Sequence, residues 1–414
     1  MAYNISVKFK ENGPGIYTDR WRWLKRGIEL LRDQGLRYNP NSILIYRELG
    51  WFFQHKIGQN LDDGNIFYKM QWASEMKDFF GNRGTNFDRL VSPQTAADFQ
   101  RLQVFTNTYK LDPAFVVAVN EKDGPFDWRL PEAHAIYWAE KGLDEVRKHP
   151  QKAKTDDEIM LRRVVYQSLL QSFHHGRIVS NPYSAPRLGP NLDLVSRVNW
   201  AYTNYYAEET DAVQTNGILT AHRNFLRDAV YFLYVANRME EARQWFKYLG
   251  DRYPNKPIVE NEPESLPKTL TLDEYAVAVV QIDIGETSQE RVTSAIQGLL
   301  TQAYASLAMG EEDRYQTMLG LAQRVHEHYD RKTAGSNGNV RIPLASFDDL
   351  KKSVIRELLD PQVPYAARAT LVTRLGLPAS LLVSVAPDTN AAPATLAPGP
   401  TNSPATNSAG PARP

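Results

Sequence analysis

Apolar residues recur at three- and four-residue steps along most of this chain. The segment DRWRWLKRGIELLRDQGL, residues 19–36, carries four of them at this spacing: Trp21, Leu24, Ile28 and Leu31. This period places the apolar side chains on one face of an α-helix. The segment NSILIYRELGWFFQHKIG at 41–58 begins with Ser42, a residue type that caps helices, and continues with the same period. The pattern therefore predicts a helix in each segment.

The same spacing predicts helices along the rest of the chain. The expected segments are 61–79, 93–109, 131–148, 156–174, 191–207, 216–236, 238–250, 271–283, 288–308, 312–330, 346–359 and 363–375. Strand-like alternation is confined to ISVKFK at 5–10. Breaks rich in proline and glycine lie at 180–190, 254–267 and 333–343. Helices joined by turns, without strands between them, predict an all-α architecture.

Composition divides the chain into three parts. Residues 1–254 are expected to form a helical array, and 255–385 a further helical region that continues it. The last part, 386–414, has seven prolines, no aromatic residue and only Asp388 and Arg413 charged. A segment of this composition buries too little apolar surface to offset the entropy lost on ordering. We therefore expect a disordered C-terminal tail.

Several expected helices are followed by proline at related intervals. Pro40, Pro113, Pro150 and Pro254 are separated by 73, 37 and 104 residues. Taken as two, one and three units, these gaps give a period of about 35 to 37 residues. That period is close to the ~34-residue length of the tetratricopeptide repeat.

Small, large and helix-ending residues also recur as a helix–turn–helix repeat requires. RMEEARQWFKYLGDRYPN carries a second-helix set: Ala242, Phe246, Leu249 and Pro254. YRELGWFF carries a first-helix set: Tyr46, Leu49, Gly50 and Phe53. GIELLRDQGLRYNPNS looks like another second helix that is one residue too long. On these residues the chain resembles the tetratricopeptide-repeat family.

This resemblance implies a right-handed α-solenoid of helix–turn–helix pairs, with a continuous core and a concave groove for a partner peptide. The 21 tyrosines and 8 tryptophans suit contact surfaces, because these side chains supply interface area at small entropic cost. The sequence thus favours a non-enzymatic scaffold or adaptor that binds a partner protein, peptide or helix. The residues expected to contact the partner are Tyr46, Arg47, Trp51 and His55 on one helix, and Asn224 and Arg227 on another.

The stretch DGPFDWRLPEAHAIYWAEKGLDE, residues 123–145, has two interpretations. In the first it is a stiff turn wedged into the core: Pro131 begins a helix that Asp127 caps, and the aromatic rings of Phe126 and Trp128 fold back onto it. In the second, the chain is a carbohydrate-processing enzyme on an all-helical toroid with an acidic, tryptophan-lined cleft. The acid, base and ligand groups of that cleft would be Asp127, Glu132, His134 and Tyr137.

Charge and cysteine content limit the other functions. Lys+Arg and Asp+Glu both number 48, and zero net charge argues against a general nucleic-acid-binding face. The absence of cysteine excludes disulfides, thiol nucleophiles and cysteine-based metal sites. The histidine pairs lack the spacing of metal ligands, so no metal or cofactor is expected. No apolar run is long enough to predict a membrane span, and the compartment, cytoplasmic or envelope-associated, stays open.

Overall fold

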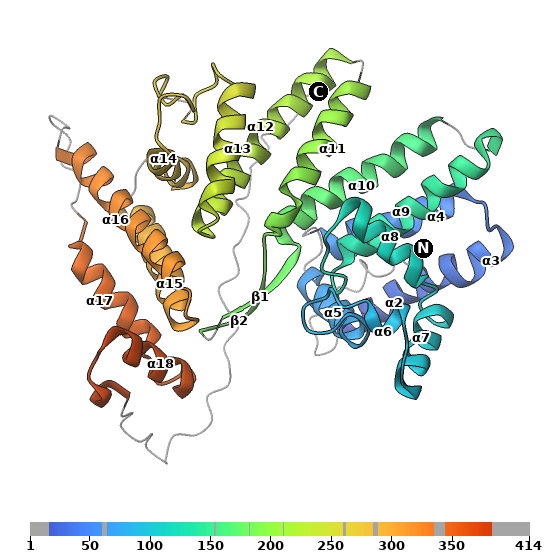
Figure 1. The fold of residues 1–414 in the computed structure, drawn as a ribbon, viewed down its shortest axis with the longest axis horizontal. Coiled ribbons are helices and arrows are strands. Elements are labelled where there is room, and N and C mark those ends of the chain that lie inside the picture. Colours follow the sequence, from blue (N-terminus) through green and yellow to red (C-terminus); the bar gives the residue numbers. More distant parts are fainter. Residues whose placement is uncertain are drawn as a thin grey trace, which may run out of the picture.

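The computed structural model describes most of the chain before residue 383. The described segments are 16–59, 64–152, 155–181, 183–209, 211–259, 262–284, 289–334 and 344–382. They are mostly helical (Figure 1), which confirms the predicted all-α class. The ISVKFK segment and the predicted tail at 386–414 lie outside the described residues.

The N-terminal helices form the bundle at the right of Figure 1. They are α2 (Ile16–Glu29), α3 (Leu36–Tyr38), α4 (Ile43–Trp51), α5 (Asn65–Phe80), α6 (Asp88–Val91), α7 (Ala96–Asn107), α8 (Pro113–Asp123), α9 (Pro131–Lys148) and α10 (Thr155–His175). Two π-helical stretches, Leu30–Gly35 and Phe52–Gly58, continue α2 and α4. The first lies within residues 27–42, the segment that resembles a second repeat helix with one extra residue, and a π turn accommodates an extra residue without ending the helix.

The remaining helices extend the array toward the left of Figure 1. They are α11 (Val195–Glu208), α12 (Ala212–Val235), α13 (Met239–Arg252), α14 (Leu272–Ile284), α15 (Gln289–Ala308), α16 (Glu312–Ala334), α17 (Phe347–Leu358) and α18 (Tyr365–Leu375). Short 3-10 turns lie at Pro150–Lys152, Leu192–Leu194 and Ala379–Leu382. Helix α14 follows residue 254 and packs on α12 and α13, which precede that residue, as well as on α15 and α16. The division of the chain at residue 254 stays a prediction.

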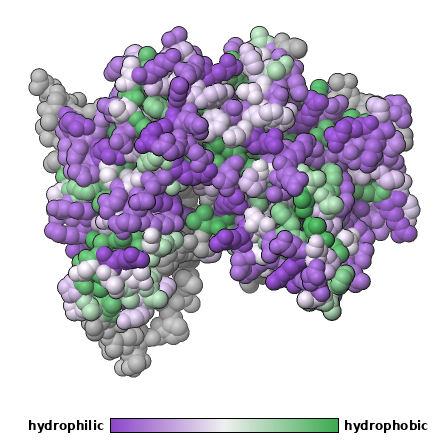
Figure 2. Space-filling model, in the orientation of Figure 1, coloured by the Kyte–Doolittle hydropathy of each residue, from purple (hydrophilic) through white to green (hydrophobic). Residues whose placement is uncertain are grey.

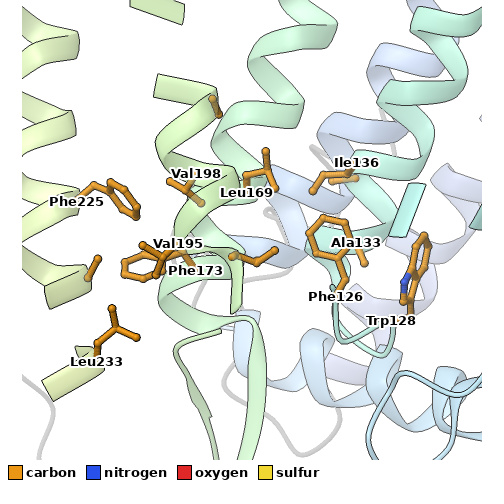
Figure 3. Packing of buried hydrophobic residues seen from close by; sticks show 14 of the residues in the cluster. Phe126, Trp128, Ala133, Ile136, Leu169, Phe173, Val195, Val198, Phe225 and Leu233 are labelled. Carbon is orange, nitrogen blue, oxygen red and sulfur yellow. The ribbon is translucent and has the colours of Figure 1, made fainter. Parts of the chain in front are cut away.

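Consecutive helices pack as pairs around one core. The most extensive contacts join α9 to α10, α12 to α13 and α15 to α16, and α4 lies against α9. Figure 3 follows the core from Trp128 and Ile136, through Leu169 and Phe173 on α10, to Phe225 on α12. Each helix hides its apolar face against its neighbours, as the helical spacing requires.

Residues taken from the repeat pattern occupy helix contacts. Ala242 and Leu249 of α13 are buried. Gly50 of α4 faces α9 so closely that an added Cβ would lie 3.2 Å from the backbone oxygen of Ala135. A larger residue at position 50 would force the two helices apart.

One of the four prolines that are spaced at related intervals begins a helix. Pro113 is the first residue of α8, and the side chain of Asp112 caps that helix by accepting from the backbone N–H groups of Ala114 and Phe115. Proline suits the first turn because the amide hydrogen it lacks has no partner within the helix there. Because Pro113 was taken to follow the end of a helix, the sequence did not predict helix α8.

A β-hairpin interrupts the helices where the sequence indicated only a proline- and glycine-rich break. Strands β1 (Arg177–Asn181) and β2 (Ser184–Gly189) pair antiparallel, with Ile178 opposite Leu188. The expectation of a plain break was wrong because so short a pairing leaves little periodicity to detect. In Figure 1 the hairpin points away from α10 and α11 toward α18. There the Tyr183 hydroxyl donates to the carbonyl of Ala367 at 3.1 Å.

Candidate functional site

The aromatic stretch before α9 is part of the core. The side chains of Phe126 and Trp128 are almost completely buried. The side-chain oxygen of Asn120 accepts from the backbone N–H of Phe126 at 2.9 Å and from the indole N–H of Trp128 at 3.0 Å. The interpretation as a turn wedged into the helical core is confirmed for these two rings.

Asp127 does not cap α9, contrary to the expectation from sequence. Leu130 occupies the N-cap position and makes no side-chain capping bond. The Oδ1 atom of Asp127 instead accepts from the backbone N–H and the Nε–H of Arg129, at 3.1 and 2.8 Å. The carboxylate is drawn to the guanidinium because both groups are buried and each needs an ionic partner.

The other three residues of the enzymatic interpretation lie inside the protein. Burial raises the pKa of Glu132 to about 7, an effect that the charge of Lys69 opposes. Burial lowers the pKa of His134 to about 4, and its Nε2 lies 2.9 Å from the carbonyl oxygen of Trp128. The hydroxyl oxygen of Tyr137 accepts from the backbone N–H of Asp112 at 2.9 Å.

The carbohydrate hypothesis gains no support from this arrangement. Such a mechanism requires an acid and a base or nucleophile on either side of a bound sugar. Asp127, Glu132, His134 and Tyr137 are each less than 4% exposed, which leaves a sugar no direct approach to them. The hypothesis remains a prediction without a described cleft.

The partner-contact residues expected on α4 and the following π turn are all half-buried. The rings of Trp51 and His55 stack with centroids 4.6 Å apart. The Tyr46 hydroxyl donates to the carbonyl of Pro40 at 2.9 Å, and Arg47 lies 3.1 Å from the carboxylate of Glu48. These side chains contribute to contacts within the chain.

The two contact residues expected on α12 are not brought near the first group. Asn224 and Arg227 are half-buried, and the guanidinium of Arg227 lies 3.6 Å from the carboxylate of Asp228. Helix α12 packs mainly on α13 and α11, whereas α4 packs mainly on α9 and α10. Figure 1 shows α10 and α11 between the two groups. The six residues therefore do not form one surface.

A pocket of about 260 Å³ opens between α10, α11 and α12. Its floor is apolar, formed by the buried side chains of Val198, Ala201 and Ile218. Tyr166 of α10 and Tyr205 of α11 form part of its walls, with ring centroids 5.8 Å apart. An engineered cavity of about 150 Å³ accepts benzene, so this pocket has room for one or two amino-acid side chains.

The polar groups of the pocket are neutral. No charged residue and no tryptophan occurs among the described residues that line it. Burial raises the pKa of Tyr202 to about 12, so its hydroxyl keeps its proton at neutral pH. Gln167 is oriented by Gln54, whose amide N–H donates to the Gln167 oxygen at 3.1 Å and leaves the Gln167 amide N–H groups for other acceptors. The pocket thus combines an apolar floor with hydrogen-bond donors.

Sequence reasoning missed this pocket. A signal existed in NWAYTNYYAE, where Tyr202 and Tyr205 are three residues apart and so share a helix face. That signal did not identify α10 as the opposite wall, because the approach of Tyr166 to α11 depends on tertiary packing. Figure 2 shows a largely hydrophilic face with small apolar patches, so broad hydrophobicity does not mark a site either.

Comparisons with protein-family models, curated proteins and solved structures gave no match to this chain. Within the described residues, no group of three or more histidine or acidic side chains is arranged to hold a metal ion. No helix in that part of the chain is both long and apolar enough to cross a bilayer. The function is therefore argued from the pocket.

Proposed function

We propose that this protein is a non-enzymatic interaction scaffold whose pocket between α10, α11 and α12 binds a peptide or helix of a partner protein. The observation that carries the proposal is the open, uncharged pocket with an apolar floor and tyrosine walls. Tyrosine is enriched at binding hot spots because its ring supplies contact area while its hydroxyl offers a hydrogen bond. The pocket takes the role expected of a concave groove.

The size of the pocket sets the strength of binding. Complete burial of one apolar side chain contributes about 1.5–3 kcal/mol. An anchor of two side chains therefore supplies about 3–6 kcal/mol before the cost of association, which corresponds to an affinity weaker than micromolar. A scaffold that exchanges partners is consistent with this range.

We further propose that the helix pairs form a right-handed α-solenoid of the tetratricopeptide type. Support comes from the pairing of α9 with α10, α12 with α13 and α15 with α16, each pair consecutive in sequence. Neighbouring pairs share one buried cluster, as stacked repeats do. The pocket would then lie between adjacent repeats.

The proposal is tested by blocking the pocket at Gly217. This residue lines the pocket, and an added Cβ would meet no atom within 4 Å. Gly217→Phe therefore introduces a ring without a clash at its Cβ. Gly298 of α15 is a matched control, because it is also an exposed helical glycine with no atom within 4 Å of an added Cβ, and it does not line the pocket.

Peptides would be selected from a random displayed library on the full-length chain, and their affinities measured by fluorescence polarisation. We expect selected peptides to carry adjacent apolar or proline residues and to bind Gly217→Phe at least about tenfold more weakly, the effect of losing ~1.4 kcal/mol. Gly298→Phe should bind like the wild type. Equal affinity for all three proteins would place the binding surface elsewhere and refute the proposal.

A further inference from the structure

The pocket presents donors that the chain itself does not use. The hydroxyls of Tyr166, Tyr202 and Tyr205 have no hydrogen-bond partner among the described residues. The amide N–H groups of Gln167 also point to no partner in that part of the chain. A ligand that matches these groups must bring an apolar surface together with several hydrogen-bond acceptors.

A polyproline II segment has this chemistry. Its backbone makes no internal hydrogen bonds, so its carbonyl groups remain available as acceptors. Its proline rings pack against aromatic side chains, and proline-rich segments are bound in this way by aromatic-lined grooves. Because the conformation forms before binding, less entropy is lost than for an ordinary peptide.

This chain carries such a segment at its C-terminus. Residues 386–414 contain seven prolines, lack aromatic residues and end in the sequence PARP, which has the proline spacing of a P-x-x-P motif. From Leu382, where the described structure ends, the chain continues to residue 414. At ~3.1 Å per residue that length extends to about 100 Å. The extended tail is therefore more than twice as long as helix α12, which lines the pocket and whose 24 residues span about 36 Å.

Charge favours one orientation. The connection between α11 and α12, one turn beyond the tyrosines of α11, carries Glu208, Glu209 and Asp211. Arg162 pairs with both Glu158 at 2.7 Å and Glu208 at 2.6 Å, and Arg252 lies over the ring of Tyr206. These two cations face three carboxylates, those of Glu158, Glu208 and Asp211, so this end of the pocket carries an excess of negative charge. Arg413 is the cationic residue of the tail. The positive charge of Arg413 lies next to the acidic residues when the C-terminal P-x-x-P motif occupies this end of the pocket.

We propose that the pocket between α10, α11 and α12 binds the proline-rich tail of its own chain in a polyproline II conformation, and that a partner segment must displace it. The proposal rests on the proposed function, since both use the same pocket. A tethered segment has an effective concentration on the order of 1 mM. A tail with an intrinsic Kd of about 0.1 mM would therefore occupy the pocket about nine-tenths of the time.

The first experiment follows the tail amides of the ¹⁵N-labelled full chain by NMR. A docked tail tumbles with the 47.1 kDa protein, so its amide signals are broad in the wild type. We expect Gly217→Phe to increase these intensities several-fold, and Gly298→Phe to leave them unchanged. Equal intensities in the wild type and Gly217→Phe would overturn the proposal. Broadening that disappears on dilution would also overturn it, because the pocket would then hold the tail of a second copy.

The second experiment adds a fluorescent synthetic peptide of residues 386–414 to the full-length chain. Because the resident tail competes with it, its apparent affinity should be about tenfold weaker for the wild type than for a Pro411→Ala/Pro414→Ala chain. Equal affinities would contradict a resident tail. If library peptides still need an open pocket while the tail amides stay sharp, the tail proposal fails and the proposed function stands.

Discussion

Replacing Trp128 by alanine tests whether the aromatic stretch before α9 is core. The indole is completely buried, and its N–H donates to Asn120 at 3.0 Å. Truncation of a buried aromatic residue costs about 3–5 kcal/mol, and the lost hydrogen bond places the change at the upper end of that range. Asn120 keeps its bond from the Phe126 amide, so no further cost for an unpaired acceptor is added.

Trp200 of α11 supplies a matched control. It is 44% exposed, and the guanidinium of Arg197 lies 5.5 Å from its ring centroid. An exposed cation–π contact contributes about 0.5–1 kcal/mol, so Trp200→Ala should lower the free energy of unfolding by less than about 1 kcal/mol.

Differential scanning calorimetry separates the two variants. The entropy of unfolding grows with chain length, so for a chain of 414 residues 1 kcal/mol shifts the Tm by only about 1 °C. Trp128→Ala should therefore lower the Tm by about 4–5 °C, and Trp200→Ala by no more than about 1 °C. Trp128→Phe should fall between them, since it keeps a ring but loses the indole hydrogen bond. If Trp128→Ala and Trp200→Ala melted at the same temperature, the assignment of Trp128 to the core would be wrong.

Three further changes have defined outcomes. Gly217→Ala and Gly298→Ala should each raise the free energy of unfolding by about 1 kcal/mol in urea titrations, because each adds a helix-favouring Cβ in open space; a loss of stability would contradict this. Burial raises the pKa of Glu132 from 4.5 to about 7, so the folded protein retains a proton that the unfolded chain has lost and stability falls as the pH rises through this window. Glu132→Gln should therefore gain stability relative to the wild type, on the order of 3 kcal/mol above pH 7, and a pH-independent difference in urea unfolding would refute the shift. Tyr183→Phe removes the bond to the Ala367 carbonyl, worth about 1 kcal/mol, and should speed amide exchange in the hairpin; unchanged exchange by mass spectrometry would show that the contact does not hold the tip.

The expected boundaries of two helices lie close to the observed ones. The segment expected at 131–148 is α9 (Pro131–Lys148), and the one expected at 238–250 is α13 (Met239–Arg252). Apolar spacing and a proline at the first turn are properties of neighbouring residues, so they are visible in the sequence. The same proline signal misled at Pro113, because proline is common both after a helix and at its start.

Contacts between distant residues could not be predicted in this way. Asp127, expected to cap α9, instead binds the guanidinium of Arg129, which also donates to the carbonyl of Asn82, a residue far away in the sequence. The half-buried state of Trp51 and His55 depends on their stacking and on the packing of α4 against α9 and α10. Exposure is a property of the assembled helices, and sequence spacing gives only the face on which a residue lies.

The sequence by itself determined an all-α protein with a core of amphipathic helices, and it set apart a proline-rich segment at the C-terminus. These follow from periodicity and composition, which act over a few residues. Only the tertiary structure decided that Tyr166 meets Tyr205 across α10 and α11, that the hairpin tip reaches α18, and that Glu132 lies in the interior. Those features depend on the angles and distances at which whole helices pack, and many side chains set these together.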